Sequence, residues 1–312
     1  MEIDKKDLVV CMESITKKFG DFVANDGIDL DIKKGEIHSL LGENGAGKTT
    51  LMNMLYGMSS PTSGDIYINN EKKEFKDPND AIEAGLGMVH QHFMLIEPFT
   101  VVENIVLGME PMNGVKVDIK KAREDVIELS NRYGFKIDPD AKIQDISVGT
   151  QQKVEILKVL YRGADILIFD EPTAVLTPQE ITELMEIIKN LAKEGKSIII
   201  ITHKLKEIKK VANRCTIIRR GKKIDTVNVS EVTESELAEM MVGRSVHLDV
   251  NKKDVKSGET ILRIEKLCAK DFRNVKKLDD LNLDVKAGEI HGIAGVDGNG
   301  QSELIEIITG LK

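Results

Sequence analysis

The sequence has no tryptophan, few other aromatic residues and only three cysteines in 312 residues, namely Cys11, Cys215 and Cys268. The cysteines stand far apart and form no C-x-x-C pair, so neither a disulfide framework nor a zinc site is expected. Their apolar, strand-like surroundings instead predict that all three pack in cores.

Long apolar runs and an excess of positive charge are also missing. No apolar run approaches the roughly 18 residues that span a bilayer, and the charged residues 1–7 do not fit a signal peptide. The net charge is −8, from 44 basic and 52 acidic residues, so no broad attraction to nucleic acid is expected. The composition is typical of a soluble protein of one large or two ordinary domains, and a reducing cytoplasm fits best.

The clearest motif present is G-x-x-x-x-G-K-[ST] at residues 42–49, between the apolar run 36–41 and a helix-like segment at 50–56. The glycines let backbone N–H groups close around phosphates, and the following helix points its positive end at them. Lys48 is expected to reach the β- and γ-phosphates, and the Thr49 hydroxyl to bind Mg²⁺. The alternative is a glycine-rich turn that merely starts a helix.

Two further segments end in polar residues that suit this chemistry. The apolar strand 165–169 ends in Asp170 and Glu171, as expected for a buried parallel strand that delivers acids to its C-terminal edge. Asp170 suits Mg²⁺, and Glu171 could polarise a water; the alternative is two solvated acids in a turn. His203 follows the apolar strand 197–202. It could sense a γ-phosphate there, or it could have a purely structural role.

The rest of residues 8–241 alternates between strand and helix patterns. We predict strands at 8–12, 27–32, 65–68, 86–90, 215–219 and 222–227, and helices at 81–85, 101–107, 119–133, 153–161, 177–192 and 231–241. A glycine-containing turn, residues 147–152, is expected to open the helix at 153. Phe19 stands in a polar turn, where its ring could either pack against the loop or contact an adenine. His90 and His92 face opposite ways on a strand and chelate a metal poorly.

The sequence repeats itself near its end. Residues 279–291 mirror residues 26–38, and the second loop, 295–302, keeps the glycines but has Gln301 where the first has Lys48. One hairpin and one helix cannot close a sheet, so a second domain is expected to be incomplete here. Either the sequence is truncated or this tail packs onto something else.

Together these segments resemble the nucleotide-binding subunit of an ABC transporter over essentially the whole chain. Residues 42–49 match Walker A and residues 166–171 match Walker B, while residues 147–151 are similar to the LSGGQ signature. Gln91 matches the Q-loop, His203 the H-loop and Phe19 the aromatic A-loop. The resemblance implies an α/β P-loop NTPase fold with a β-subdomain and a helical signature subdomain, plus the start of a second ABC domain. The implied boundaries are a first domain at 1–243 with its helical subdomain at about 92–163, a linker at 244–259 and a degenerate domain at 260–312.

The resemblance also implies ATP and Mg²⁺ as ligands and assigns a role to each matching residue. Glu171 would orient or deprotonate the attacking water, His203 would hold the γ-phosphate, and Phe19 would stack on adenine. Gln91 would contact Mg²⁺ and the water, whereas Ser147 and Gly149 would act in trans on the nucleotide of the opposite half. The implied catalytic residues are Lys48, Gln91, Glu171 and His203, and the implied metal ligands are Thr49, Gln91 and Asp170. The implied nucleotide contacts are Phe19, Gly42, Glu43, Asn44, Gly45, Ala46, Gly47, Lys48, Thr49, Thr50, Ser147, Gly149 and Gln151.

Within the family, residues 88–95 and 295–304 look most like the nucleoside branch of the simple-sugar and nucleoside importers. This implies permease subunits in the membrane, an indirect solute-binding protein, a second ABC half and a location at the cytoplasmic face of the membrane. Phe93, Met94, Leu95 and Phe99 could receive the permease or could be subdomain core. Alternative functions are a soluble ABC ATPase, disfavoured because no basic arm or coiled-coil insertion is present, and a nucleotide-gated module without turnover.

Several residues depart from the family pattern. Val148 replaces a signature glycine and Thr150 the usual glutamine, so phosphate contact there is expected to be weaker. Thr177 stands where many family members have aspartate. The two ABC halves are therefore not expected to influence each other equally through this loop. With Gln301 in the second loop, one competent and one degenerate composite site are expected.

Overall fold

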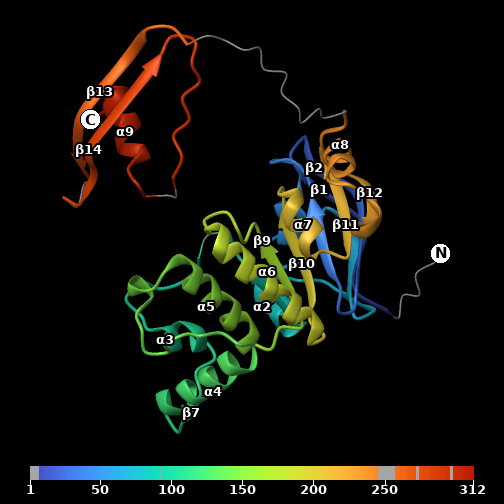
Figure 1. Cartoon of the computed structure of the whole chain (residues 1–312). Helices are drawn as coiled ribbons and strands as arrows, with labels where there is room; N and C mark the ends of the chain where they lie inside the picture. The colour runs from blue at the N-terminus through green and yellow to red at the C-terminus, as the bar shows by residue number, and fades with distance from the viewer. Residues whose placement is uncertain (1–6, 92, 245–256, 272–273, 296–297) are drawn as a thin grey trace. The chain divides into compact units, whose positions relative to one another are not determined.

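Figure 1 shows the computed structural model of the chain, which describes residues 7–91, 93–244, 257–271, 274–295 and 298–312. The chain divides into two compact units, residues 1–246 and 247–312, and each is described by itself. Most of the expected linker, residues 244–259, lies outside the described residues, as do His92 and residues 296–297 of the second loop.

The larger unit is built on a mainly parallel six-stranded sheet of strand order β12-β11-β3-β10-β9-β6. Its strands are β3 (Ile37–Leu41), β6 (Leu86–Val89), β9 (Ile166–Asp170), β10 (Ser197–Thr202), β11 (Arg214–Arg219) and β12 (Lys222–Asn228). β3, β9 and β10 are buried along their whole length, as their apolar sequences predicted. Because β10 pairs in parallel with both β3 and β9, the residues that follow β3 and β9 lie at the same sheet edge.

A second, antiparallel sheet has the order β2-β1-β4-β5. Its strands are β1 (Leu8–Phe19), β2 (Phe22–Lys33), β4 (Ser63–Ile68) and β5 (Glu71–Lys73). The first two strands run much further than predicted, because they pair with each other up to Phe19 and Phe22 at the hairpin tip. Backbone pairing therefore extends the strands through polar sequence, and Phe19 ends a strand rather than standing in a loop.

Helices cover the sheets of this unit. They are α1 (Lys48–Leu55), α2 (Pro78–Glu83), α6 (Pro178–Lys193), α7 (Leu205–Val211) and α8 (Glu234–Val242), with the short η3 (Val229–Glu231) before α8. The apolar residues of α1 share one core with residues of both sheets, among them Met12, Leu40 and Ile168. Helix α1 and the loop before it are therefore held from both sheets.

A group of helices forms a separate part of the larger unit, and Figure 1 shows α3, α4 and α5 gathered there. Its elements are α3 (Val101–Val106), α4 (Ile119–Arg132), η2 (Ile143–Asp145) and α5 (Val148–Tyr161), with the small hairpin of β7 (Met112–Asn113) and β8 (Lys116–Val117). α3 begins at a capping box: the Thr100 side chain accepts the N–H of Glu103, and the Glu103 carboxylate accepts the N–H of Thr100.

Helices α2, α5 and α8 begin three or more residues away from the predicted starts, because a capping side chain starts each: Asp77 accepts the N–H of Asn79 before α2. α5 begins at Val148 rather than at residue 153, since the Ser147 hydroxyl accepts the N–H of Thr150. α8 begins at Glu234 rather than at residue 231, since Thr233 forms a capping box there. The segment predicted as a turn before α5 is therefore the first turn of that helix.

The smaller unit consists, in its described part, of β13 (Thr260–Lys270), β14 (Lys276–Lys286) and α9 (Gln301–Ile308). The buried hydrophobic residues found in it are Leu278 and Leu304. Cys268 is exposed, so the prediction that all three cysteines pack in cores was wrong for it; Cys215 is buried and Cys11 half-buried. The described residues of this unit bury only two hydrophobic side chains, so they form too little core to cover Cys268. None of the helices in the described ranges has the length and apolar character that a membrane crossing requires.

Candidate nucleotide-binding site

The loop at residues 42–49 joins β3 to α1 and depends on glycine. Gly47, the residue before α1, has φ of 102°, a conformation that side chains rarely adopt. A Cβ there would lie 2.6 Å from the carbonyl oxygen of Ala24 and 2.7 Å from Nδ2 of Asn25. Since no side chain caps α1, its first N–H groups are free of a side-chain partner and point toward the loop. Such a helix start is suited to bind phosphate.

Lys48 is buried in this loop, and only 5% of its surface is exposed. Its Nζ donates to the carbonyl oxygens of Gly42 at 2.8 Å and Glu43 at 3.0 Å. Burial lowers the pKa of Lys48, and the nearby negative charges of Glu171 and Asp170 oppose that change. The ammonium group is therefore held where it can meet an anionic ligand.

The two acids after β9 lie in different surroundings. Asp170 is buried, and its pKa is raised because burial penalises the charged carboxylate and Glu171 adds a second negative charge, while Lys48 acts the other way. Glu171 has φ of 44°, the left-handed region, and its N–H donates to the carbonyl of Ile201 at 3.0 Å. Its carboxylate Oε1 lies 3.1 Å from Nδ1 of His203, which follows β10. The structure therefore joins the two polar ends of adjacent strands.

A cavity of about 430 Å³ lies over the loop. Its lining residues are Phe22, Ala24, Asn44, Gly45, Gly47, Lys48, Thr49, Thr50, Gln91 and Glu171. Predicted site residues from three separate segments, those around Lys48, Gln91 and Glu171, thus meet in one space. Gly42, Glu43 and Ala46 belong to the same loop, and Asp170 and His203 adjoin Glu171.

Phe19 is not among the residues that line this cavity, whereas Phe22 is. The two rings stand on paired residues at the hairpin tip, and both are more than half exposed. The ring of Phe19 lies under the ammonium of Lys17, 5.2 Å from its centroid. The assignment of Phe19 to adenine remains a prediction. The sequence analysis did not name Phe22 as a candidate site residue. A second aromatic residue three positions after Phe19 in the same polar segment could have indicated it.

Asn25 was also missed. It is fully buried in β2, and its Nδ2 donates to the carbonyl of Gly47 at 3.1 Å, so it fixes the loop from the neighbouring sheet. An asparagine inside a strand is unfavourable unless its amide is bonded, and this gave the one sequence signal.

The signature residues lie at the start of α5 and do not line the cavity. The Ser147 hydroxyl caps the helix, and the Gln151 amide donates to the carbonyl of Ile143 at 3.2 Å. The N–H of Gly149 donates to Oε1 of Glu180 at 3.2 Å. Within one copy of the chain these residues therefore serve local structure, and their action on a nucleotide in trans stays a prediction.

The donor set suits a magnesium ion. Thr49, Gln91 and Asp170 offer a hydroxyl, an amide and a carboxylate, all with the oxygen donors that Mg²⁺ prefers. Burial raises the pKa of Asp170 because it disfavours the charged carboxylate. A cation beside this carboxylate would stabilise its charged form.

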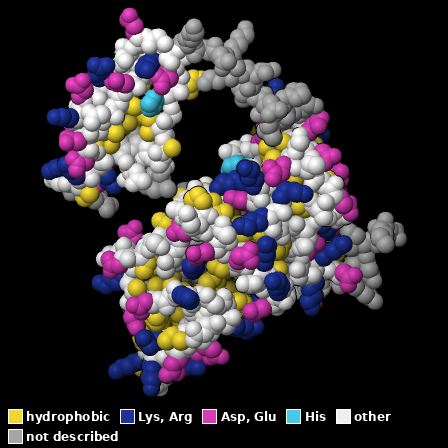
Figure 2. Space-filling view, viewed as in Figure 1, with side chains coloured by type: hydrophobic (Ala, Val, Ile, Leu, Met, Phe, Trp, Pro, Cys, Tyr) yellow, Lys and Arg dark blue, Asp and Glu magenta, His cyan; other side chains and the backbone are white. Residues whose placement is uncertain are grey.

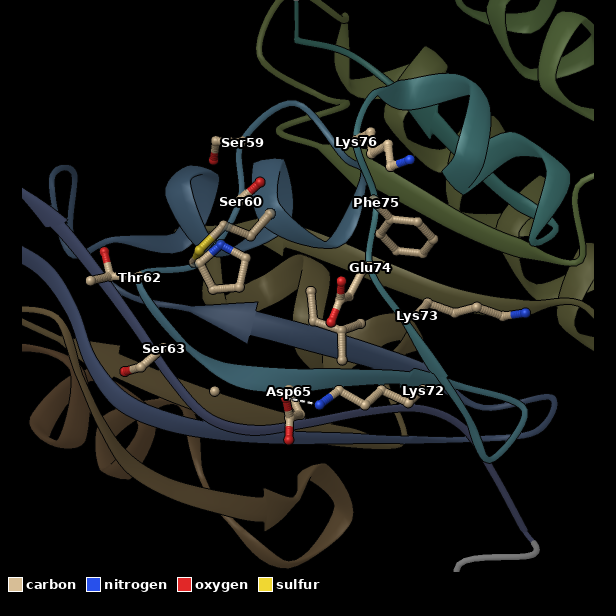
Figure 3. Close-up of a pocket in the computed structure, with 14 residues that line it drawn as sticks. Ser59, Ser60, Thr62, Ser63, Asp65, Lys72, Lys73, Glu74, Phe75 and Lys76 are labelled. Atoms are coloured by element: carbon tan, nitrogen blue, oxygen red, sulfur yellow. Dashed lines mark ion pairs between the residues drawn. The ribbon is translucent and has the colours of Figure 1, made fainter.

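A second cavity, of about 340 Å³, opens between β4, β5 and the loop after α1 (Figure 3). Hydroxyl side chains such as Ser60 and Thr62 stand along one side, and Lys72 reaches toward Asp65 on the other, at 2.7 Å. No predicted site residue lines it. It therefore takes no part in the site described above.

Known proteins share both the sequence and the fold. A family model described as "ABC transporter" matches residues 25–174. The ATP-binding cassette MJ1267 of an ABC transporter, in its ADP conformation, superposes with a TM-score of 0.67 at 23% identity, covering 76% of this chain and 99% of that one. For cbiO1 from Clostridium perfringens the TM-score is 0.65 at 28% identity, covering 76% and 95%. Residues 25–174 thus match the ABC transporter family model, and the larger unit has the ATP-binding cassette fold, as the resemblance of the motifs implied.

Among curated proteins, three relatives of this chain are import ATP-binding proteins. The chain is 59% identical over 303 residues to the nucleoside import ATP-binding protein NupA of Lactococcus lactis subsp. cremoris (strain MG1363), covering 97% of this chain and 60% of that protein. It is 58% identical over 304 residues to the guanosine import ATP-binding protein NupO of Bacillus subtilis (strain 168), with the same coverage. A glucose import ATP-binding protein, TsgD13 of Haloferax volcanii, is 47% identical, with 96% and 60% covered. The predicted resemblance to the nucleoside branch is confirmed, and the chain spans about 60% of the length of these relatives.

Proposed function

We propose that the chain is the ATP-binding and ATP-hydrolysing subunit of an ABC importer that takes up a nucleoside. The observation that carries this proposal is the convergence of Lys48, Gln91 and Glu171 in one cavity over a helix start. The names of the two relatives near 60% identity favour a nucleoside over a sugar as the imported solute.

In this proposal the residues position ATP rather than react with it. The loop N–H groups and Lys48 hold the β- and γ-phosphates, releasing the ammonium from the carbonyls it now contacts. Glu171 orients the attacking water or accepts its proton, and His203 lies next to it to hold the γ-phosphate. Thr49, Gln91 and Asp170 would hold Mg²⁺, which when bound supplies positive charge at the β- and γ-phosphates.

Hydrolysis also needs a partner copy or half, because Ser147 and Gly149 do not reach the cavity of their own chain. Closure of two halves over ATP would then drive permease subunits in the membrane, to which a solute-binding protein delivers the nucleoside from outside. The chain would act at the cytoplasmic face of the membrane.

The helical subdomain offers a surface for such a permease. Figure 2 shows hydrophobic side chains exposed over the part where Figure 1 places α3, α4 and α5. Met94 is 60% exposed and Phe99 37%, whereas Leu95 packs against the subdomain core. Met94 and Phe99 thus support the interface hypothesis, and Leu95 the core alternative. We expect Met94→Glu to spare ATP turnover and to break co-purification with the permeases.

Two substitutions test the catalytic assignment. Glu171→Gln keeps the size of the side chain but cannot take a proton, so ATP binding is retained and hydrolysis falls by about 100- to 10,000-fold. Lys48→Ala removes the charge at the phosphates and weakens ATP binding by about 10- to 150-fold. A fluorescent ATP analogue reports binding, and phosphate release at several protein concentrations reports turnover. Wild-type turnover in Glu171→Gln would refute the role of Glu171.

A further inference from the structure

A buried acid on α7 connects the two turns that carry the catalytic pair. Glu207 is only 7% exposed. Its Oε1 accepts the hydroxyl of Thr173 at 2.6 Å, and its Oε2 accepts the hydroxyl of Thr202 at 3.2 Å. Thr173 stands two residues after Glu171, and Thr202 directly precedes His203. One carboxylate therefore joins the turn after β9 to the end of β10.

Lys204 closes the same network. Its Nζ donates to the carbonyl oxygen of Thr173 at 3.0 Å and to the Thr173 hydroxyl at 2.9 Å. Its backbone N–H donates to the Thr202 hydroxyl at 3.0 Å, and its ammonium lies 3.5 Å from Glu207. Both Thr173 and Thr202 are 2% exposed, so their bonds to Glu207 are buried, whereas Lys204 closes the network from its partly exposed side. A bonded network in such surroundings holds its members in one arrangement.

The turn after β9 needs such support. Glu171 adopts φ of 44°, and a residue other than glycine in this region stores about 1–3 kcal/mol of strain that its surroundings must sustain. The side chain of Glu171 meets His203 at 3.1 Å, although His203 is 43% exposed and comes from another loop. The relative placement of these two side chains thus depends on what fixes their loops to each other.

We propose that Glu207 is a positioning residue for ATP hydrolysis, which fixes the loop of Glu171 against the loop of His203 through Thr173 and Thr202. The inference rests on the proposed function, because it takes Glu171 as the group that acts on the attacking water. Glu207 itself touches neither ATP nor the water. Its removal leaves the phosphate-binding loop intact and lets the catalytic carboxylate move.

The full chain and MgATP test this with Glu207→Ala, Glu207→Gln and a matched control. Glu36 is the control, since it is equally buried, at 7%, and bridges His38 and Arg214, but precedes β3 at the end away from the loop. Glu207→Ala is expected to lower kcat by about 100-fold, since a misplacement of about 1 Å costs that much, and to leave KM and ATP affinity within about twofold. Glu207→Gln, which still accepts one hydroxyl, should fall between. Glu36→Ala should lower Tm at least as much while keeping kcat within about twofold below its melting temperature.

A double variant separates positioning from general loosening. In the Glu171→Gln chain the carboxylate that Glu207 positions is already absent, so adding Glu207→Ala should change the residual turnover by less than about twofold. Equal losses of kcat in Glu207→Ala and Glu36→Ala, or full additivity with Glu171→Gln, would overturn the proposal. If the wild-type chain hydrolyses ATP and Glu207→Ala has the same kcat, this inference alone is overturned. If the wild-type chain hydrolyses ATP no faster than Lys48→Ala, the proposed function is overturned as well.

Discussion

In the proposed function, single residues would contact separate parts of ATP. Lys48 and the loop glycines would contact the phosphates alone, and burial of Lys48 lowers its pKa. The base would be held elsewhere, at the tip of the β1–β2 hairpin, where Phe22 lines the cavity and Phe19 does not. Phosphate and base recognition would therefore come from different elements, and mutation should separate them.

Phe22→Ala should weaken ATP binding by about 5- to 150-fold, the range measured for loss of one base-stacking ring. Binding of inorganic triphosphate, which has no base, should not change, and calorimetric titration of both ligands measures this. Phe19→Ala is the matched comparison on the paired residue. A loss confined to Phe19→Ala would assign adenine to that ring, as the family resemblance implies, and would contradict a role for Phe22.

The three cysteines should differ sharply in reactivity toward a thiol reagent at pH 8. Burial raises the pKa of the Cys215 thiol to about 12, so almost no thiolate forms in the folded chain. The unfolded chain ionises near pH 8.5, so this thiol makes the fold less stable as pH rises from about 8.5 to 12. Cys268 is exposed and should react first, and Cys268→Ser should remove the fast phase. Rapid labelling of Cys215 in the native chain would contradict its burial.

At the scale of elements, the start of α5 is held by α6. Glu180 forms a capping box with Thr177 at the start of α6, and its other carboxylate oxygen accepts the N–H of Gly149. An added Cβ on Gly149 would lie 2.7 Å from Cδ of Glu180. Glycine at this signature position therefore lets Glu180 keep its capping geometry, independently of any nucleotide, and a Cβ there would make the Glu180 side chain move.

This packing reverses the usual effect of alanine in a helix. Gly149→Ala should destabilise the chain by about 1 kcal/mol in urea unfolding, because Glu180 must leave its capping box. In a Glu180→Ala background the same substitution should instead stabilise by about 0.5–1 kcal/mol, the ordinary gain over glycine. Stabilisation by Gly149→Ala in both backgrounds would show that the contact with Glu180 does not constrain α5.

At the scale of the whole molecule, the two units differ in how much core they contain. Three hydrophobic clusters lie in the larger unit and join its sheets and helices. In the described part of the smaller unit, the buried hydrophobic residues are Leu278 and Leu304. Two buried side chains cannot offset the entropy of ordering a hairpin and a helix.

Residues 1–246 should therefore fold alone, with a cooperative thermal transition and ATP affinity within about threefold of the full chain. Residues 247–312 alone should show no cooperative transition by circular dichroism. Limited proteolysis of the full chain gives an independent readout, since the larger unit should persist as a stable fragment. A cooperative transition in the short fragment would mean that it holds more core than the described residues show.

The sequence by itself determined those features that local spacing encodes. The glycine and lysine positions at 42–49 define the phosphate-binding loop. The apolar runs of β9 and β10 define buried parallel strands, of which β9 ends in Asp170 and β10 is followed by His203. The buried strands ending at one sheet edge followed from these patterns, and the cassette fold from the resemblance of the motifs to ABC ATPases. Helix starts were less predictable, because a cap such as Ser147 or Thr233 outweighs the weak propensity of the residues after it.

Only the tertiary structure decided which distant side chains complete the site. Asn25 holds the loop at Gly47 from another sheet, Glu180 fills the space beside Gly149, and Glu207 joins two turns through buried hydroxyls. Each pair comes from separate elements, and hydrogen bonds between them depend on how those elements pack. Local patterns of residues do not specify that packing, so apart from the polar Asn25 inside a strand they gave no sign of these contacts.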